Sequence, residues 1–278
     1  MPAMAIARWD PTSLAGADLG LVAYRLTAAA VHLLGGMRRF VRPNDTVWIK
    51  PNIGWNRAPE LAANTNPDVV AALVALCLDA GAKRVKVGDN CGSPARRTYK
   101  ISGIAAAARA AGAEVIRIDD GDFREVDLAG ELLGKWPMAA EIADADLVIN
   151  AAVVKHHDIA GVTACMKNAM GIFGGRRNDW HKDLATALCD AGAFLKPRLC
   201  VLDAVRVLLR HGPESGSPED VELRGLVAAG TDIVALDALG DELLGQRAEG
   251  QALLRAAQDR GLGVIDYRSL ALRETTLD

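Results

Sequence analysis

The stretch 79–89, DAGAKRVKVGD, decides the fold class of this 278-residue chain. A glycine follows the last turn of an apolar helix there, and glycine readily adopts the left-handed conformation that ends helices. A short run with β-branched residues then closes on an aspartate. The same order returns at 110–119 (AAGAEVIRID) and, more loosely, at 190–203 (DAGAFLKPRLCVLD). Repeated helix-to-strand units predict an α/β fold with a mostly parallel sheet and helices on both faces.

The rest of the chain extends this alternation. Asn66 before Pro67 is a strong helix start, because Asn caps helices and Pro suits their first position. The sequence predicts a single domain over 1–278, with a small irregular insert near 121–137 and a Gly/Pro/Ser-rich loop at 210–220. Strands are expected at 4–7, 46–50 and 146–150, and helices at 19–34, 67–80, 102–111, 163–170, 184–191, 233–244 and 251–260.

Composition excludes several classes of protein. The net charge is −3 and half of the residues are apolar, which gives no case for a nucleic-acid partner. The longest apolar run, 69–78, is too short to span a bilayer. The first residues lack a basic start followed by an apolar core, so no secretory signal is read and the cytoplasm is expected. The five cysteines form no CxxC or Cys-His finger spacing.

The segment 150–177, NAAVVKHHDIAGVTACMKNAMGIFGGRR, carries the densest set of chemical groups. It follows the predicted strand 146–150, and ligands bind beyond the carboxyl ends of strands in open α/β sheets. Lys155, His156 and His157 are candidates for acid–base catalysis. If they lie on a strand, at most one histidine faces a given cleft; if they lie in a loop, both can. Candidates for binding an anion follow at Lys167, Asn168 and Arg176.

Other strand and helix ends add polar side chains. Lys50 and Asn52 end the second strand and suit a carboxylate or phosphate, with a solvated lysine and a turn asparagine as the alternative. Thr65 and Asn66 open a helix whose free N–H groups favour an anion, although simple capping by Asn66 is the better interpretation of this motif alone. Asp89, at the end of a strand, is a candidate for the catalytic set.

A metal site has weaker support. Cys91 and Cys165 lie near predicted loops, and Asp203 and Asp237 carry carboxylates, so these four are the candidate ligands. An iron–sulfur cluster or a divalent metal is the cofactor they would hold. Cys77 and Cys200, within apolar runs, are interpreted as core residues.

At these residues the chain resembles domain-of-unknown-function family 362. The resemblance covers nearly the whole chain, although the family's Pro-Lys-x-Lys-x-His pattern reads Val153-Val154-Lys155-His156-His157 here. Many members carry an additional ferredoxin-like cysteine cluster, which this chain lacks. The resemblance implies that one cleft gathers Lys50, Asn52, Asp89, His157, Lys167, Asn168 and Asp237. It rests on K50-P51-N52, T65-N66-P67, G81-A82 to G88-D89, K155-H156-H157, K167-N168-A169-M170-G171, Asp203, G212-P213 with G216, and T231 to A238.

Three hypotheses stay open. The first is an isomerase or oxidoreductase acting on a small carboxylate or phosphate, with an outside electron donor if it reduces its substrate. The second is a metal- or iron–sulfur-binding redox protein whose site is shared between subunits, and a homodimer is plausible on apolar content. The third is a non-catalytic module that binds a small ligand. An α/β fold alone favours none of them.

Overall fold

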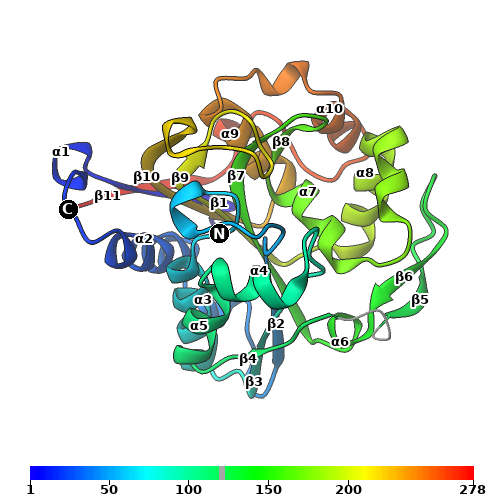
Figure 1. Cartoon of the computed structure of the whole chain (residues 1–278), viewed down its shortest axis with the longest axis horizontal. Helices are drawn as coiled ribbons and strands as arrows, with labels where there is room; N and C mark the ends of the chain where they lie inside the picture. Colours follow the sequence, from blue (N-terminus) through cyan, green and yellow to red (C-terminus); the bar gives the residue numbers. More distant parts are fainter. Residues whose placement is uncertain (119–122) are drawn as a thin grey trace.

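A mixed sheet of nine strands forms the centre of the computed structural model, which describes residues 1–118 and 123–278 (Figure 1). The strand order is β11-β1-β10-β9-β7-β2-β3-β4, and β8 pairs with β7. The pairs from β9 to β4 are parallel, as is β1 with β11, while β10 runs antiparallel to both neighbours. The strands are β1 (Met4–Trp9), β2 (Thr46–Pro51), β3 (Arg84–Val87), β4 (Glu114–Val115), β7 (Leu147–His157), β8 (Gly161–Thr163), β9 (Leu199–Leu208), β10 (Val221–Gly230) and β11 (Leu272–Leu277).

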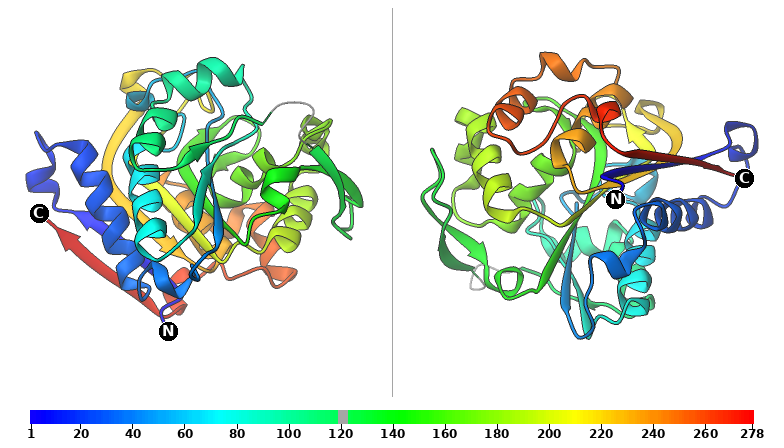
Figure 2. Two further views of the ribbon diagram at one scale, coloured as in Figure 1. Left: turned by 90° about the horizontal axis from the view of Figure 1, so that it is seen from below. Right: turned by 180° about the vertical axis from the view of Figure 1, so that it is seen from behind.

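Helices cover both faces of this sheet, as the two further views show (Figure 2). Alternate side chains of β2 explain why: Val47 and Ile49 pack into one apolar core and Trp48 into the other. One face carries α2 (Leu19–Leu33), α3 (Pro67–Asp79) and α5 (Ile104–Ala110). The other carries α7 (Cys165–Asn168), α8 (Leu184–Leu195), α9 (Ile233–Leu243) and α10 (Ala252–Asp259). The predicted α/β class, with its mostly parallel sheet, is confirmed. The remaining α-helices are α1 (Pro11–Leu14), α4 (Ala95–Ile101) and α6 (Ala140–Ala143).

Two of the three repeated units fold as predicted. Gly81 and Gly112 each have φ of +101° and end a helix before a strand. The third unit is different, because Gly192 lies inside α8 and the helix ends at Lys196, which takes the left-handed conformation itself. The predicted helix 163–170 is also shorter: Thr163 belongs to β8, and a 3₁₀ helix η3 (Ala169–Ile172) follows α7.

The predicted insert forms a hairpin where it is described. Strands β5 (Phe123–Asp127) and β6 (Lys135–Ala139) pair antiparallel in a separate two-stranded sheet. Asp119 and the start of the insert lie outside the described residues. Within the described ranges, no helix combines the length and apolar character needed to cross a bilayer.

The register of the parallel strands brings distant polar residues to one edge. Lys50 of β2 pairs with Asn150, so the last residues of β7 extend beyond β2. Asp89 follows β3, the other neighbour of β2. Side chains at 50, 89 and 155 therefore meet at the carboxyl edge of the sheet, where α/β proteins form their binding sites.

Candidate functional site

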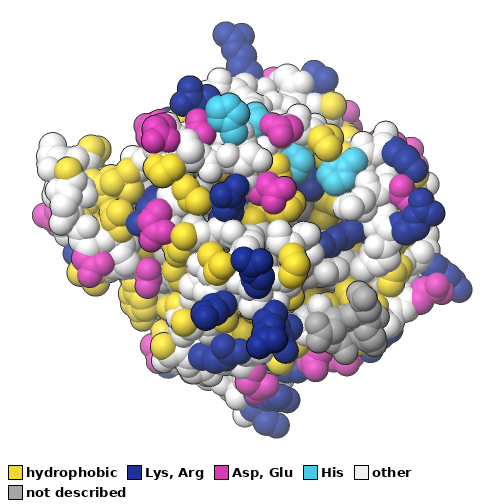
Figure 3. Space-filling model, viewed as in Figure 1, with side chains coloured by type: hydrophobic (Ala, Val, Ile, Leu, Met, Phe, Trp, Pro, Cys, Tyr) yellow, Lys and Arg dark blue, Asp and Glu magenta, His cyan; other side chains and the backbone are white. Residues whose placement is uncertain are grey.

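A cavity of about 360 Å³ opens at this edge. On the face drawn in Figure 3, histidine and Lys or Arg side chains gather around a hollow in the upper half. A volume near the lower end of the usual range for ligand pockets fits a small molecule. The wall is formed by Lys155, His157, Lys167, Arg177 and His181, the floor by Lys50, Asn52, Asp89, Asn168 and Gly171, and the mouth by Trp55, Asp158, Ile159, Pro213 and Glu214, among others.

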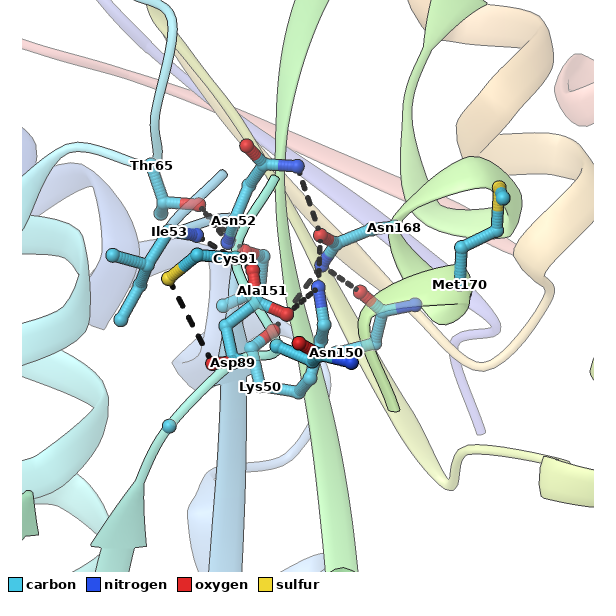
Figure 4. Close-up of polar contacts among 12 residues, drawn as sticks. Lys50, Asn52, Ile53, Thr65, Asp89, Cys91, Asn150, Ala151, Asn168 and Met170 are labelled. Carbon is cyan, nitrogen blue, oxygen red and sulfur yellow. Dashed lines mark hydrogen bonds and ion pairs between the residues drawn. The ribbon is translucent and has the colours of Figure 1, made fainter. Parts of the chain in front are cut away.

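The floor is a closed network centred on Lys50 (Figure 4). Its Nζ lies 3.0 Å from Asp89 Oδ1 and donates to Asn168 Oδ1 at 2.5 Å, and all three side chains are buried. Burial lowers the pKa of Lys50, and the charge of Asp89 opposes that shift. The Asn168 amide donates to Lys50 O and Asn150 Oδ1, so both of its hydrogens are engaged. The floor therefore holds itself together without a ligand.

Gly171 lets the backbone approach this ion pair. A Cβ at that position would overlap Asp89 Oδ1 and would lie 2.7 Å from Lys50 Nζ. Asp89 Oδ2 also accepts the backbone N–H of Ile53 at 2.8 Å. The segment after α7 thus packs closely against the pair and leaves both side chains almost without exposed surface.

Lys155 stands on the wall and is 1% exposed. Its Nζ donates to Ala63 O and, at 3.1 Å, to Asn52 Oδ1. Burial and then the charges of Lys167 and Lys50 hold the pKa of Lys155 well below its usual value. Both of its described partners are neutral oxygens, so the charge of Lys155 is not balanced by a paired carboxylate.

Lys167, at α7, is the most weakly held lysine of the wall. Its Nζ has one described partner, the thioether sulfur of Met170 at 2.9 Å, and sulfur is a weak acceptor. Burial, followed by the charges of Arg177 and Lys50, lowers the pKa of Lys167 to about 8. The amine therefore titrates close to neutral pH.

His157 faces the cavity and His156 does not. Both lie on β7, where neighbouring side chains point to opposite faces, and only His157 lines the cavity. His157 Nδ1 accepts the backbone N–H groups of Ile159 and Ala160 at 3.1 and 3.2 Å. Its hydrogen therefore sits on Nε2. Burial and the charge of Lys167 lower the pKa of His157 to about 3, so the ring is neutral and acts as a donor rather than as a base. His156 instead lies 3.6 Å from Asp158 Oδ1.

His181 is a site residue that sequence reasoning missed. It lies in the 3₁₀ helix η4 (Arg177–Asp183), with its ring stacked on His157 at a centroid distance of 6.1 Å. Its Nδ1 is 3.0 Å from Asn178 O, a group that only accepts, so the hydrogen sits on Nδ1 and Nε2 keeps its lone pair. Burial lowers the pKa of His181, and the bond to Asn178 opposes that shift. This ring can accept a proton where His157 donates one.

Arg177, rather than the predicted Arg176, contributes to the cavity. Its guanidinium donates to four carbonyl oxygens, those of Asn90, Cys91, Met170 and Phe173, at 2.7 to 3.2 Å. The side chain of Arg176 is 86% exposed and pairs with Asp179 at 3.0 Å. Arg176 is therefore not among the residues that line the cavity: it lies just before η4 and points to solvent, whereas Arg177 begins that 3₁₀ helix, a difference that the GGRR run does not show.

Thr65 and Asn66 support the site without lining it. Thr65 Oγ1 accepts the N–H of Asn52 and donates to Ala151 O, each at 2.8 Å. The carboxylate of Asp203 accepts the N–H of Asn66 at 2.7 Å, and Asn66 caps α3. The carboxylate of Asp203 therefore already occupies the place that an anion would take at this helix start. Burial raises the pKa of Asp203 to about 6.

The candidate metal ligands do not come together. In the described ranges, no three His, Cys, Asp or Glu side chains form a group that could hold an ion. Cys165 is fully buried and its N–H donates to Asp237 Oδ1 at 2.7 Å, behind the cavity. Asp237 thus caps α7, and burial raises its pKa to about 8. Cys91 lies elsewhere, near Asp89, and burial raises the pKa of its thiol. Because Cys165 has no exposed surface, it cannot reach across a subunit interface to share a cluster.

Comparison with known proteins places this cavity within a family. The model of "Domain of unknown function (DUF362)" matches residues 47–241, which include every residue lining the cavity. The chain belongs to the DUF362 family. The resemblance seen in the sequence is thereby confirmed, while the implied place of Asp237 in the cleft is not what the structure shows.

A curated relative of this DUF362 protein is the thylakoid-associated protein sll1697 of Synechocystis sp. (strain ATCC 27184 / PCC 6803 / Kazusa). It is 29% identical over 235 residues, which are 82% of this chain and 71% of the relative. A crystal structure of a Thermotoga maritima protein shares the fold, with a TM-score of 0.50 at 13% identity, over 86% of this chain and 60% of that one. The lactate racemase apoprotein of Thermoanaerobacterium thermosaccharolyticum has a TM-score of 0.46 at 9% identity, over 87% and 57%. This chain thus spans less than two thirds of either solved chain.

Proposed function

We propose that this DUF362 protein is an enzyme that binds a small carboxylate or phosphate in the cavity and moves a proton to or from it. The observation that carries the proposal is the excess of basic side chains on the cavity wall. Lys155, Lys167 and Arg177 lie there, whereas the one buried carboxylate among the lining residues, Asp89, is already paired with Lys50. An anion would supply the missing countercharge in a medium where charges interact strongly.

The two histidines support proton transfer beyond simple binding. His157 presents a fixed Nε2–H that can hold an oxygen of the ligand, and His181 presents an Nε2 lone pair that can take a proton. Pairs of titratable groups with opposite roles are typical of acid–base sites. A module that only binds an anion has no need of a base beside the cations.

The expected compartment remains the cytoplasm. All five cysteines are free thiols, which fits a reducing environment. Thylakoid association is stated in the name of the cyanobacterial relative, and we do not extend it to this chain.

The test combines binding with isotope exchange. Small carboxylates and phosphates are screened by calorimetry, and those that bind are incubated with the protein in D₂O while NMR follows loss of carbon-bound protons. We expect His181→Gln to abolish exchange but to keep binding, and His157→Gln to weaken both. His32→Gln, an exposed change on α2, is the matched control. Binding without exchange in the unaltered protein would leave a ligand-binding module, and no binding at all would overturn the proposal.

A further inference from the structure

The amine of Lys167 is free for chemistry in a way that the other cavity lysines are not. Lys50 is engaged with Asp89 and Asn168, and Lys155 donates to Ala63 O and Asn52. Both are 1% exposed. Lys167 is only partly buried, lines the cavity and has a thioether as its described partner. Losing its proton would cost Lys167 little hydrogen bonding.

The groups around this amine define a ligand with two different parts. The guanidinium of Arg177 and the Nζ of Lys155, which has no carboxylate partner, favour a carboxylate. The Nε2–H of the neutral His157 ring suits an uncharged oxygen, such as that of a carbonyl, because it donates without adding charge. A cavity of about 360 Å³ holds a small molecule that carries both groups.

We propose that Lys167 forms an imine with a small 2-oxo carboxylate. This inference rests on the proposed function and names its substrate class. The nitrogen attacks the carbonyl carbon, both amine hydrogens leave with the carbonyl oxygen as water, and a C=N bond replaces C=O. Once this nitrogen takes a proton from solvent, the neighbouring C–H bond becomes acidic. His181 Nε2 removes that proton, the C–H electron pair forms a C=C bond, and the C=N pair moves onto nitrogen.

The electrostatics of the wall support this role. A lysine acts as a nucleophile only when neutral, and the low pKa of Lys167 arises from burial and from its cationic neighbours Arg177 and Lys50. The Arg177 guanidinium remains charged while the amine is neutral, so the site keeps an attraction for a carboxylate.

Borohydride trapping tests the proposal. The full chain is treated with pyruvate and sodium borohydride, which reduces an imine to a stable secondary amine, and the adduct is located by peptide mass spectrometry. We expect a stoichiometric adduct on Lys167, a yield that rises through about pH 8, and deuteration of the pyruvate methyl group in D₂O. Lactate, which has no carbonyl, should give no adduct.

Two variants make the result decisive. Lys167→Arg keeps a positive charge but cannot form an imine, so the adduct and the deuteration should vanish while pyruvate binding persists. Lys182→Met removes an exposed lysine of η4 and should change neither. If pyruvate binds but gives no adduct, or gives it on another lysine, the imine is wrong and the proposed function stands. If no small carboxylate or phosphate binds, both proposals fail.

Discussion

The floor and the wall of the cavity hold buried lysines in opposite circumstances. On the floor, Lys50 has a carboxylate at 3.0 Å and an amide oxygen at 2.5 Å. On the wall, Lys155 and Lys167 have neutral partners only, and the charge of Lys167 further lowers the pKa of Lys155. Burial alone therefore does not mark a functional lysine. Removing a buried lysine that is paired with a carboxylate leaves that carboxylate uncompensated, whereas a buried lysine without such a partner carries a desolvation cost that an anion would offset.

Lys50→Met is the change that should break the floor most severely. It leaves Asp89 buried without its countercharge, and removing one partner of a buried pair typically costs about 3–5 kcal/mol. Lys167→Met, in contrast, removes a partly buried charge that has no paired carboxylate and should not destabilise the chain. Urea unfolding followed by circular dichroism measures both. Equal losses in the two variants would remove the distinction between floor and wall.

Gly171→Ala should lower stability by disturbing the ion pair on the floor. Its Cβ would overlap Asp89 Oδ1, and forcing extra atoms into a packed site costs about 1–3 kcal/mol. Gly134→Ala, at a position with open space around the added carbon, is the matched control and should be nearly neutral. The same unfolding experiment reads out both changes, and an unaffected Gly171→Ala would show that the ion pair does not need this close approach.

Lys155→Met should weaken the binding of an anion at the wall of the cavity. Removing one cation near the bound anion is expected to weaken affinity by roughly tenfold or more, about 1.4 kcal/mol. Calorimetric titration with whichever small carboxylate binds the unaltered protein measures the loss. Lys182→Met, on the exposed side of η4, should leave affinity unchanged. A variant at 155 that binds as tightly as the parent would contradict the assigned role of its charge.

A further expected effect is a pH dependence of stability due to Lys167. Its pKa of about 8 in the folded chain lies below the ordinary 10.5, so the unfolded chain binds the proton more tightly. Below pH 8 the group is charged in both states, and folding carries the full cost of burying it. Between about pH 8 and 10.5 that cost disappears, so stability should rise relative to Lys167→Met. Unfolding curves of the two proteins across this range test the sign, and a difference that falls with pH would refute it.

Much of the fold could be predicted from the sequence because its signals are local. The glycines at 81 and 112 and the cap at Asn66 act within a few residues, and each forms the predicted boundary. At Gly192 the prediction of a helix end was wrong. A helix can contain a glycine when its other residues are well packed, and α8 continues past Gly192 with buried residues along its length. The antiparallel strand β10 and the parallel edge strand β11 were not predicted, since their pairing depends on partners far along the chain.

The site was predictable in outline for the same reason. Strand alternation on β7 separates His156 from His157, and strand ends gather Lys50 and Asp89. His181 could not be found, because a histidine in the polar run NDWHKD carries no sign that η4 folds back onto the cavity. The role of Arg177 depends likewise on carbonyls of two separate loops.

Arg177 has a mechanical consequence for how a ligand enters. Its guanidinium donates to the carbonyls of residues 90 and 91 in one segment and of residues 170 and 173 in another, so it links the two segments. That flank of the mouth cannot widen without breaking four hydrogen bonds at once. Asp158, Ile159, Pro213 and Glu214 also line the cavity, and none of the four hydrogen bonds of Arg177 involves them. If the cavity opens further to admit a small molecule, we expect the movement at these residues rather than at the segments held by Arg177.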